Sequence, residues 1–156
     1  MTSTISHHAT RTSGATRIVR ACLWLSVIVA GLALRQFGPG LGLSFAPVKY
    51  GGSILWGTMV FFAVAIVASN LSRGKIALIA AAIAVCVELF RLVHAPWLDD
   101  FRLTTSGALL LGRVFSPWNM LAYGAGILLG MVLDRKGTAA FTKVRLSARD
   151  APHSAS

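Results

Sequence analysis

The sequence predicts an all-α membrane protein with four transmembrane helices, and three observations support this fold class. Hydrophobic residues make up 55% of the 156-residue chain and charged residues only 13%, whereas a soluble domain is usually about one quarter charged. No charged residue occurs from Ser53 to Ser72, which indicates lipid as the solvent of that segment. Four apolar segments also approach the roughly 20 residues that a helix needs to cross a bilayer core.

The chain divides into two terminal tails and one transmembrane domain. Residues 1–16 are rich in Ser, Thr and His, which predicts a disordered tail, and residues 135–156 form a basic cytoplasmic tail. The transmembrane domain covers residues 17–134. Its first span has the basic start of a secretory signal, so cleavage there stays open. The predicted spans are residues 18–37, 50–69, 76–94 and 117–133.

Basic residues are distributed unevenly over the two sides of these spans. One side receives ten of them: Arg11, Arg17, Arg20, Arg73, Lys75, Arg135, Lys136, Lys143, Arg145 and Arg149. The other side receives four: Arg35, Lys49, Arg102 and Arg113. The positive-inside rule therefore predicts a multi-pass membrane protein with both termini in the cytoplasm. The net charge of +10 also suits nucleic-acid binding. However, the basic residues flank apolar runs, so no nucleic-acid partner is expected.

Helical spacing places small and polar residues on one stripe of each of the last two spans. The stripe of the third span is Ala77, Ala81, Ala84, Glu88 and Arg91. That of the fourth span is Asn119, Tyr123, Gly126 and Gly130. Small residues permit close helix approach, so we expect the alanines to pack against the two glycines. The polar ends of both stripes then meet at the outer-leaflet end of these helices.

The predicted polar site combines side chains from both helices and the loop between them. Its members are Glu88, Arg91, His94, Asp99, Arg102, Asn119 and Tyr123, with the interface aromatics Trp97, Phe115 and Trp118. Simpler interpretations remain open: Glu88 and Arg91 have the spacing of an ordinary intrahelical ion pair, and Arg91 has the length to reach the headgroups. His94, Asp99 and Asp100 form only a weak metal-ligating pattern, so no metal site or cofactor is expected.

Several of these residues lie in a pattern that resembles the DUF2809 family of small bacterial multi-pass membrane proteins. The resemblance rests on Glu88, residues 94–107 (HAPWLDDFRLTTSG), Gly112, Phe115, Tyr123, Gly126 and Gly130, and it covers roughly residues 50–134. This resemblance implies a location in the bacterial inner membrane. More distantly, the pattern is similar to VanZ-like membrane proteins. Arg91 stands where the family usually has Gln, and Asn119 where it has Asp, so a mechanism with two intramembrane carboxylates is not expected here.

Three hypotheses of function follow from the sequence. The first is a non-enzymatic module that binds a lipid headgroup or an amphiphilic envelope compound at the outer leaflet, where arginines pair with phosphate. The second is an accessory or assembly subunit that contacts other membrane helices or a second copy of the chain. The third is a membrane-embedded enzyme that acts on a lipid-linked substrate, with Glu88 or His94 as general base. No nucleophile elbow, HExxH motif or phosphate loop supports catalysis.

Overall fold

A computed structural model describes residues 3–93, 95–104 and 116–149, with the backbone alone described for residues 3–13, 102, 142 and 144–149. Over these residues the protein is helical and contains no strand, which confirms the predicted all-α class. The elements are α1 (Ser3–Phe37), the short 3₁₀ helix η1 (Pro39–Leu41), α2 (Phe45–Val67), α3 (Arg73–Phe90), α4 (Pro96–Leu103) and α6 (Pro117–Arg149).

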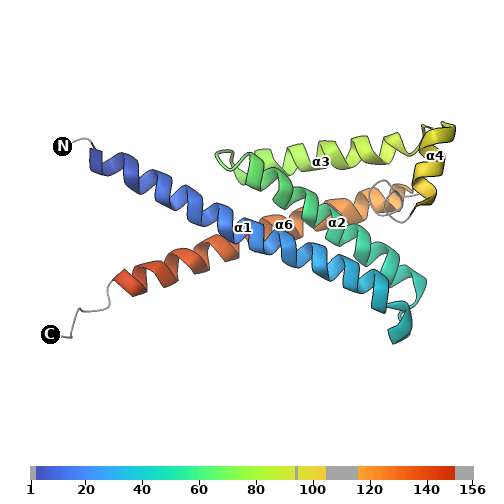
Figure 1. Cartoon of the computed structure of the whole chain (residues 1–156), viewed down its shortest axis with the longest axis horizontal. Coiled ribbons are helices and arrows are strands. Elements are labelled where there is room, and N and C mark those ends of the chain that lie inside the picture. The colour runs from blue at the N-terminus through green and yellow to red at the C-terminus, as the bar shows by residue number, and fades with distance from the viewer. Residues whose placement is uncertain (1–2, 94, 105–115, 150–156) are drawn as a thin grey trace.

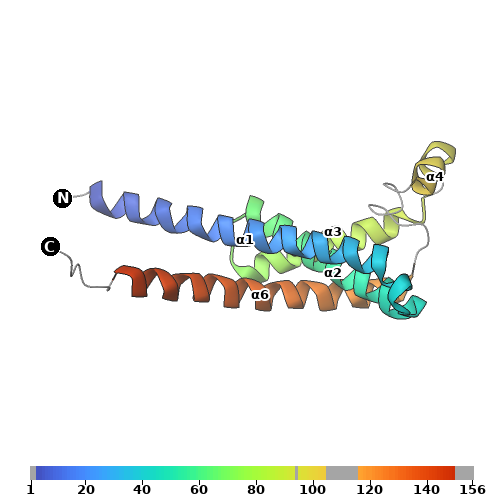
Figure 2. The same ribbon diagram turned by 60° about the horizontal axis from the view of Figure 1, so that its bottom comes forward.

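The four long helices form an elongated bundle. Figures 1 and 2 show α1 and α6 extending beyond the other helices toward the end where both chain termini lie. The short helix α4 lies at the opposite end, next to the end of α3. Helix α2 runs beside α1 and crosses α6 in Figure 1, and it contacts α1, α3 and α6. The bundle is therefore organised around α2.

Two helix starts differ from the sequence prediction by five residues or more. Helix α1 begins at Ser3, so most of the tail predicted to be disordered over residues 1–16 is helical. Helix α2 begins at Phe45 instead of Tyr50, with Pro47 in its first turn. Proline is tolerated there because the first backbone N–H groups of a helix have no intrahelical partner. The connection to α1 includes Gly42 at φ 78°, a left-handed conformation that favours glycine.

Two helices have the length and composition needed to cross a membrane: residues Gly14–Phe37 of α1 and Phe45–Val67 of α2. Their mean hydropathies are 1.9 and 1.8. Helix α3 is shorter and carries Arg73, Lys75 and Glu88, which lowers its apolar character. The protein therefore has two apolar helices of membrane-spanning length among the residues that the structure describes.

The tightest helix contact joins α2 and α6, and this corrects the predicted packing. A methyl group on Gly126 would overlap the backbone carbonyl of Ile54, and one on Gly130 would overlap the ring of Phe61. Both contacts are with α2, so the prediction that these glycines pack against Ala77, Ala81 and Ala84 of α3 is wrong. The reciprocal glycine is Gly57 of α2, which lies against the backbone of Tyr123. Small residues on both helices allow the backbones to come this close.

Candidate functional site

The end of α3 and the start of α6 form a buried polar cluster around Glu88. The Glu88 side chain is fully buried. Arg91 Nη1 donates to its Oε2 at 2.6 Å, and the backbone N–H of Ser116 donates to its Oε1 at 2.8 Å. Asn119 Nδ2 lies 3.4 Å from the same Oε1. One carboxylate thereby joins the last turn of α3 to the first turn of α6, where the helix dipole also favours a negative charge.

Tyr123 completes this group, which we call the Glu88 cluster: Glu88, Arg91, Asn119 and Tyr123. The guanidinium carbon of Arg91 lies 6.0 Å from the centre of the Tyr123 ring, a distance at which a cation is attracted to an aromatic face. Tyr123 and Asn119 are 3% and 5% exposed, and Arg91 is 9% exposed. Four polar side chains, two from the end of α3 and two from the start of α6, therefore share one desolvated site.

Helix α2 adds two contacts that the sequence analysis missed. Ser53 Oγ lies 3.4 Å from Asn119 Oδ1 as a hydrogen-bond donor. The rings of Trp56 and Tyr123 are 4.7 Å apart and tilted by 47°. A serine and a tryptophan near the start of an apolar span are common, so neither residue type indicated this contact. The Glu88 cluster, formed at the ends of α3 and α6, consequently also contacts a third helix, α2.

The other predicted site residues whose side chains the structure describes are Asp99, Trp97 and Trp118, and they do not belong to this cluster. Asp99 lies half-buried on α4. Trp97 and Trp118 are 71% and 64% exposed, so they do not close over the polar groups. His94 and Phe115 lie outside the described residues, as does the side chain of Arg102. Within the described part of the chain, no three His, Cys, Asp or Glu residues come together as a metal-ligating group.

A second buried polar cluster lies toward the end of the bundle that carries the termini, and the sequence analysis missed it. The Asp134 side chain on α6 is fully buried. Arg20 of α1 donates to both of its oxygens, Nε at 2.7 Å and Nη2 at 3.1 Å. Arg73 at the start of α3 donates through Nε at 2.8 Å. Arg20 Nη1 also donates to the Ala65 carbonyl of α2 at 2.8 Å. This Asp134 cluster links four helices.

The electrostatics of Asp134 are dominated by its two arginines. Burial alone disfavours the charged carboxylate, but the hydrogen bonds and charges of Arg20 and Arg73 outweigh it, so the pKa of Asp134 is lowered from 3.8. Arg73 also donates to Thr138 Oγ1 at 3.0 Å. Arg20 lies inside the predicted first span. A charge within a span requires a partner, and that requirement was the signal available in the sequence.

The bonding of Glu88 limits what its carboxylate can do chemically. A carboxylate offers about four lone-pair sites. Among the described residues, Arg91, Ser116 and Asn119 occupy three of them. The cluster holds one carboxylate and one guanidinium, so it is charge-balanced. Such an arrangement orients Arg91 and Tyr123 more readily than it leaves Glu88 available as a general base.

The sequence model of one protein family, described as "Protein of unknown function (DUF2809)", matches residues 44–127. The matched region covers α2, α3, α4 and the first part of α6, and it contains every residue of the Glu88 cluster. It excludes Arg20 and Asp134. No solved structure matches the chain.

Proposed function

The chain belongs to the DUF2809 family of proteins of unknown function, and we propose that it is a four-span protein of the bacterial inner membrane. In this proposal the Glu88 cluster lies at the outer leaflet and binds the phosphate-bearing headgroup of a lipid or of an amphiphilic envelope compound. The observation that carries the proposal is a buried arginine, Arg91, oriented by a carboxylate and an aromatic ring at the end of an apolar bundle. Arginine is the side chain best suited to phosphate recognition.

Exposed apolar side chains support a lipid environment for all four long helices. Leu78 on α3 is 72% exposed, and Leu128 on α6 is 63% exposed. In α1, only 11% of the most apolar window is buried within the protein. Many large apolar side chains exposed together on a protein surface mark contact with a membrane or with a partner. We therefore include α3 and α6 among the spans.

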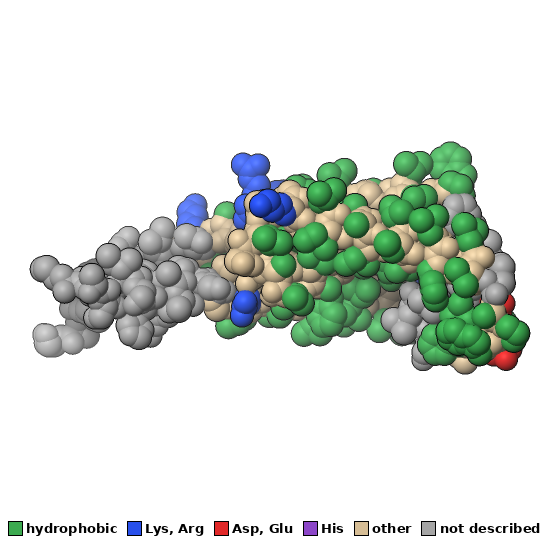
Figure 3. All heavy atoms as spheres, turned by 90° about the horizontal axis from the view of Figure 1, so that it is seen from above, with side chains coloured by type: hydrophobic (Ala, Val, Ile, Leu, Met, Phe, Trp, Pro, Cys, Tyr) green, Lys and Arg blue, Asp and Glu red, His purple; other side chains and the backbone are tan. Residues whose placement is uncertain are grey.

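The charge distribution supports an orientation with both termini in the cytoplasm. Figure 3 shows Lys and Arg side chains gathered toward the end of the molecule that carries the termini, and Asp or Glu side chains at the opposite end. Arg17, Arg73, Lys75, Arg135 and Lys136 belong to the basic end. Under the positive-inside rule this end is cytoplasmic, which sets the Glu88 cluster at the outer face.

Helix α4 supports the same arrangement. It is a short helix beside the end of α3, and it exposes Trp97, Phe101 and Leu103 while it buries Leu98. Asp99 and Asp100 provide its polar side. An amphipathic helix with an exposed tryptophan is typical of the membrane interface. In the proposal, α4 therefore lies in the outer headgroup region next to the Glu88 cluster.

The proposed orientation is tested by thiol labelling in intact cells. Cys22 and Cys86 are first replaced by Ser, and single cysteines are introduced as Asp100→Cys and Lys136→Cys. A membrane-impermeant maleimide is expected to label position 100 in intact spheroplasts and position 136 only after permeabilisation. Labelling at position 136 in intact spheroplasts, or its absence at position 100 before permeabilisation, would overturn the proposed topology.

The proposed headgroup binding is tested by counting lipid phosphorus that stays with the protein after detergent exchange. The variant is the double substitution Glu88→Gln with Arg91→Gln, which removes the guanidinium without leaving an unpaired carboxylate. Losing a charge-assisted hydrogen bond should reduce retained phospholipid roughly tenfold. Arg35→Gln is the matched control, since it removes an exposed basic residue from the same predicted side. Equal retention by the double variant and the wild type would overturn the proposal.

A further inference from the structure

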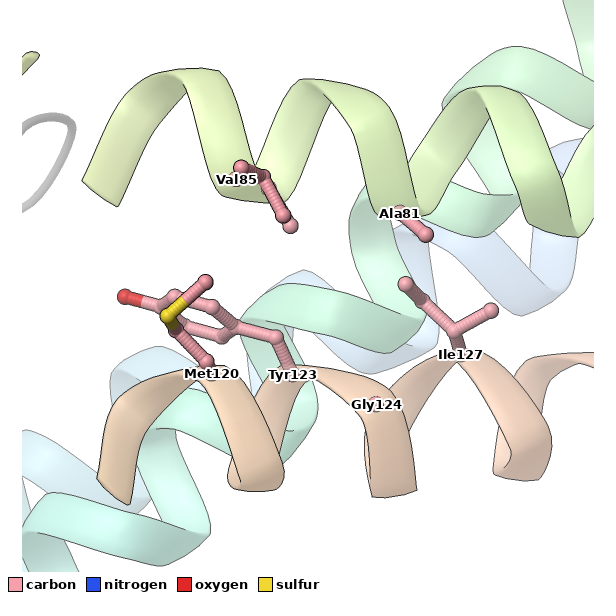
Figure 4. Close-up of a pocket in the computed structure, with 7 residues that line it drawn as sticks. Ala81, Val85, Met120, Tyr123, Gly124 and Ile127 are labelled. Atoms are coloured by element: carbon pink, nitrogen blue, oxygen red, sulfur yellow. The ribbon is translucent and has the colours of Figure 1, made fainter. Parts of the chain in front are cut away.

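An apolar crevice lies between α3 and α6, directly below the Glu88 cluster. It encloses about 80 Å³ and is lined by Ala81, Ala84, Val85, Met120, Tyr123, Gly124 and Ile127. Figure 4 shows these side chains between the two helices, with the Tyr123 ring and Met120 beside each other at one end and Ile127 at the other. The crevice exists because Ala81 of α3 and Gly124 of α6 are too small to fill the space between the two helices.

We propose that this crevice holds one alkyl chain of the lipid or amphiphile whose headgroup binds at the Glu88 cluster. The inference rests on the proposed function and adds the class of ligand: a molecule with a phosphate-bearing head and a flexible hydrocarbon tail. Tyr123 connects the two parts, because its ring lines the crevice while Arg91 lies over the same ring. A polar group at one end and an apolar slot below it match the shape of an amphiphile.

Two properties of the crevice favour an alkyl chain over other occupants. Its lining is almost entirely hydrocarbon, and apolar cavities do not hold ordered water. Its volume is also far too small for a second helix, which is about 10 Å across with its side chains. The crevice runs along Met120 to Ile127 of α6, roughly 10 Å of helix length. An alkyl chain of the ligand can therefore lie along α6 over this length.

Gly124 lines the crevice and offers a position at which a side chain can be added. A methyl group built on Gly124 meets no atom within 4 Å, and the same holds for Gly52 on α2. Gly124→Leu therefore adds a side chain into the slot, while Gly52→Leu is the matched control outside it. Gly124→Ala is the graded variant, since a single methyl group should leave most of the slot open.

The test uses the full-length protein in vesicles of phosphatidylglycerol that carries a photoactivatable diazirine in the middle of one acyl chain. After irradiation, crosslinks are mapped by mass spectrometry. We expect enrichment at Val85, Met120 and Ile127 over the exposed Val132 of α6, which reports bulk lipid. Gly124→Leu should lower crosslinking in the crevice roughly tenfold, and Gly124→Ala much less. Gly52→Leu should leave it unchanged.

Three outcomes would overturn the proposal: crosslinking that Gly124→Leu leaves unchanged, an equal loss in Gly124→Leu and Gly52→Leu, or conversion of a dimer to a monomer by Gly124→Leu. The last would identify a second copy of the chain as the occupant. Failure here is distinct from failure of the proposed function. If only the tail inference is wrong, the Glu88 and Arg91 double variant still loses phospholipid. If headgroup binding is also wrong, the double variant retains it.

Discussion

The two buried polar clusters use the same chemistry, an aspartate or glutamate held by arginine, but they differ in how the chain builds them. In the Glu88 cluster the ion pair is local, three residues apart at the end of α3, and the partners at the start of α6 lie 28 and 31 residues away. In the Asp134 cluster the partners are 114 and 61 residues away. The first pairs one carboxylate with one arginine, whereas the second shares one carboxylate between two arginines.

We interpret the Glu88 cluster as a candidate binding site and the Asp134 cluster as a contact that stabilises the helix bundle. Asp134 is bonded to α1 and to the start of α3, and Arg20 also reaches α2, so the Asp134 cluster fixes four helices relative to one another. The Glu88 cluster joins fewer elements and opens onto the apolar crevice. It is also the cluster that lies wholly inside the family match. The next substitutions test whether stability and ligand binding divide between the two clusters in this way.

The largest expected effect is that of Asp134→Ala. The substitution leaves Arg20 buried at 5% exposure without its carboxylate, and removing one partner of a buried ion pair costs about 3–5 kcal/mol. The free energy of unfolding should fall by this amount, as measured by denaturation in mixed detergent micelles. Asp100→Ala is the control, because Asp100 is exposed on α4 and should change stability little. Equal changes in unfolding free energy for the two substitutions would contradict the structural role assigned to Asp134.

Glu88→Gln is expected to have a smaller effect on stability. Gln keeps the size of the side chain and one carbonyl acceptor for the Ser116 N–H. It loses the charge opposite Arg91, and hydrogen bonds to charged groups contribute about 1.5–3 kcal/mol. The unfolding free energy in the same micelles should therefore decrease by about this amount. A loss of unfolding free energy larger than that of Asp134→Ala would mean that the Glu88 cluster, and not the Asp134 cluster, stabilises the bundle more.

The sequence predicted local features of this molecule well and long-range partners poorly. Helical spacing placed Glu88 with Arg91 on one helix face, and Asn119 with Tyr123 on another, because residues three and four apart share a helix face. It gave no basis for choosing which neighbour Gly126 packs against, since a small residue fits any close helix. The answer depended on Gly57 of α2, whose partner is decided by the packing of the whole bundle.

The Asp134 cluster shows the same limit for charged residues. Arg20 and Arg73 were counted only as flanking charges that set the orientation, and Asp134 only as the end of a span. Asp134 is the lone acidic residue between Asp100 and Asp150, which makes it the natural partner for a basic residue inside a span. Its particular arginines are decided by how α1 and α3 pack against α6, and periodicity within one helix carries no information on that.

Gly126→Ala tests the contact that aligns both clusters on α6. The added methyl group would overlap the Ile54 carbonyl of α2, and overpacking of this kind costs about 1–3 kcal/mol. The helices should separate, which lowers both the unfolding free energy and the retention of phospholipid at the Glu88 cluster. Gly52→Ala is the control on the partner helix α2, because its methyl group meets open space outside the crevice. Retention that survives in Gly126→Ala would show that the Glu88 cluster does not depend on the α2–α6 contact.

The smallest expected effect separates the two arginines of the Asp134 cluster. Arg73 is 43% exposed at its side chain, whereas Arg20 is 6% exposed. Exposed ion pairs contribute about 0.2–1 kcal/mol because water and salt screen them, so Arg73→Ala should lower the unfolding free energy by no more than this. Arg20→Ala should cost several times as much, since it leaves Asp134 buried with only the exposed partner. Salt titration provides the check, because the contribution of Arg73 should decline with ionic strength while that of Arg20 persists. Equal losses of unfolding free energy for the two substitutions would mean that burial does not distinguish these arginines. The exposed Arg73 would then stabilise the Asp134 cluster as much as the buried Arg20.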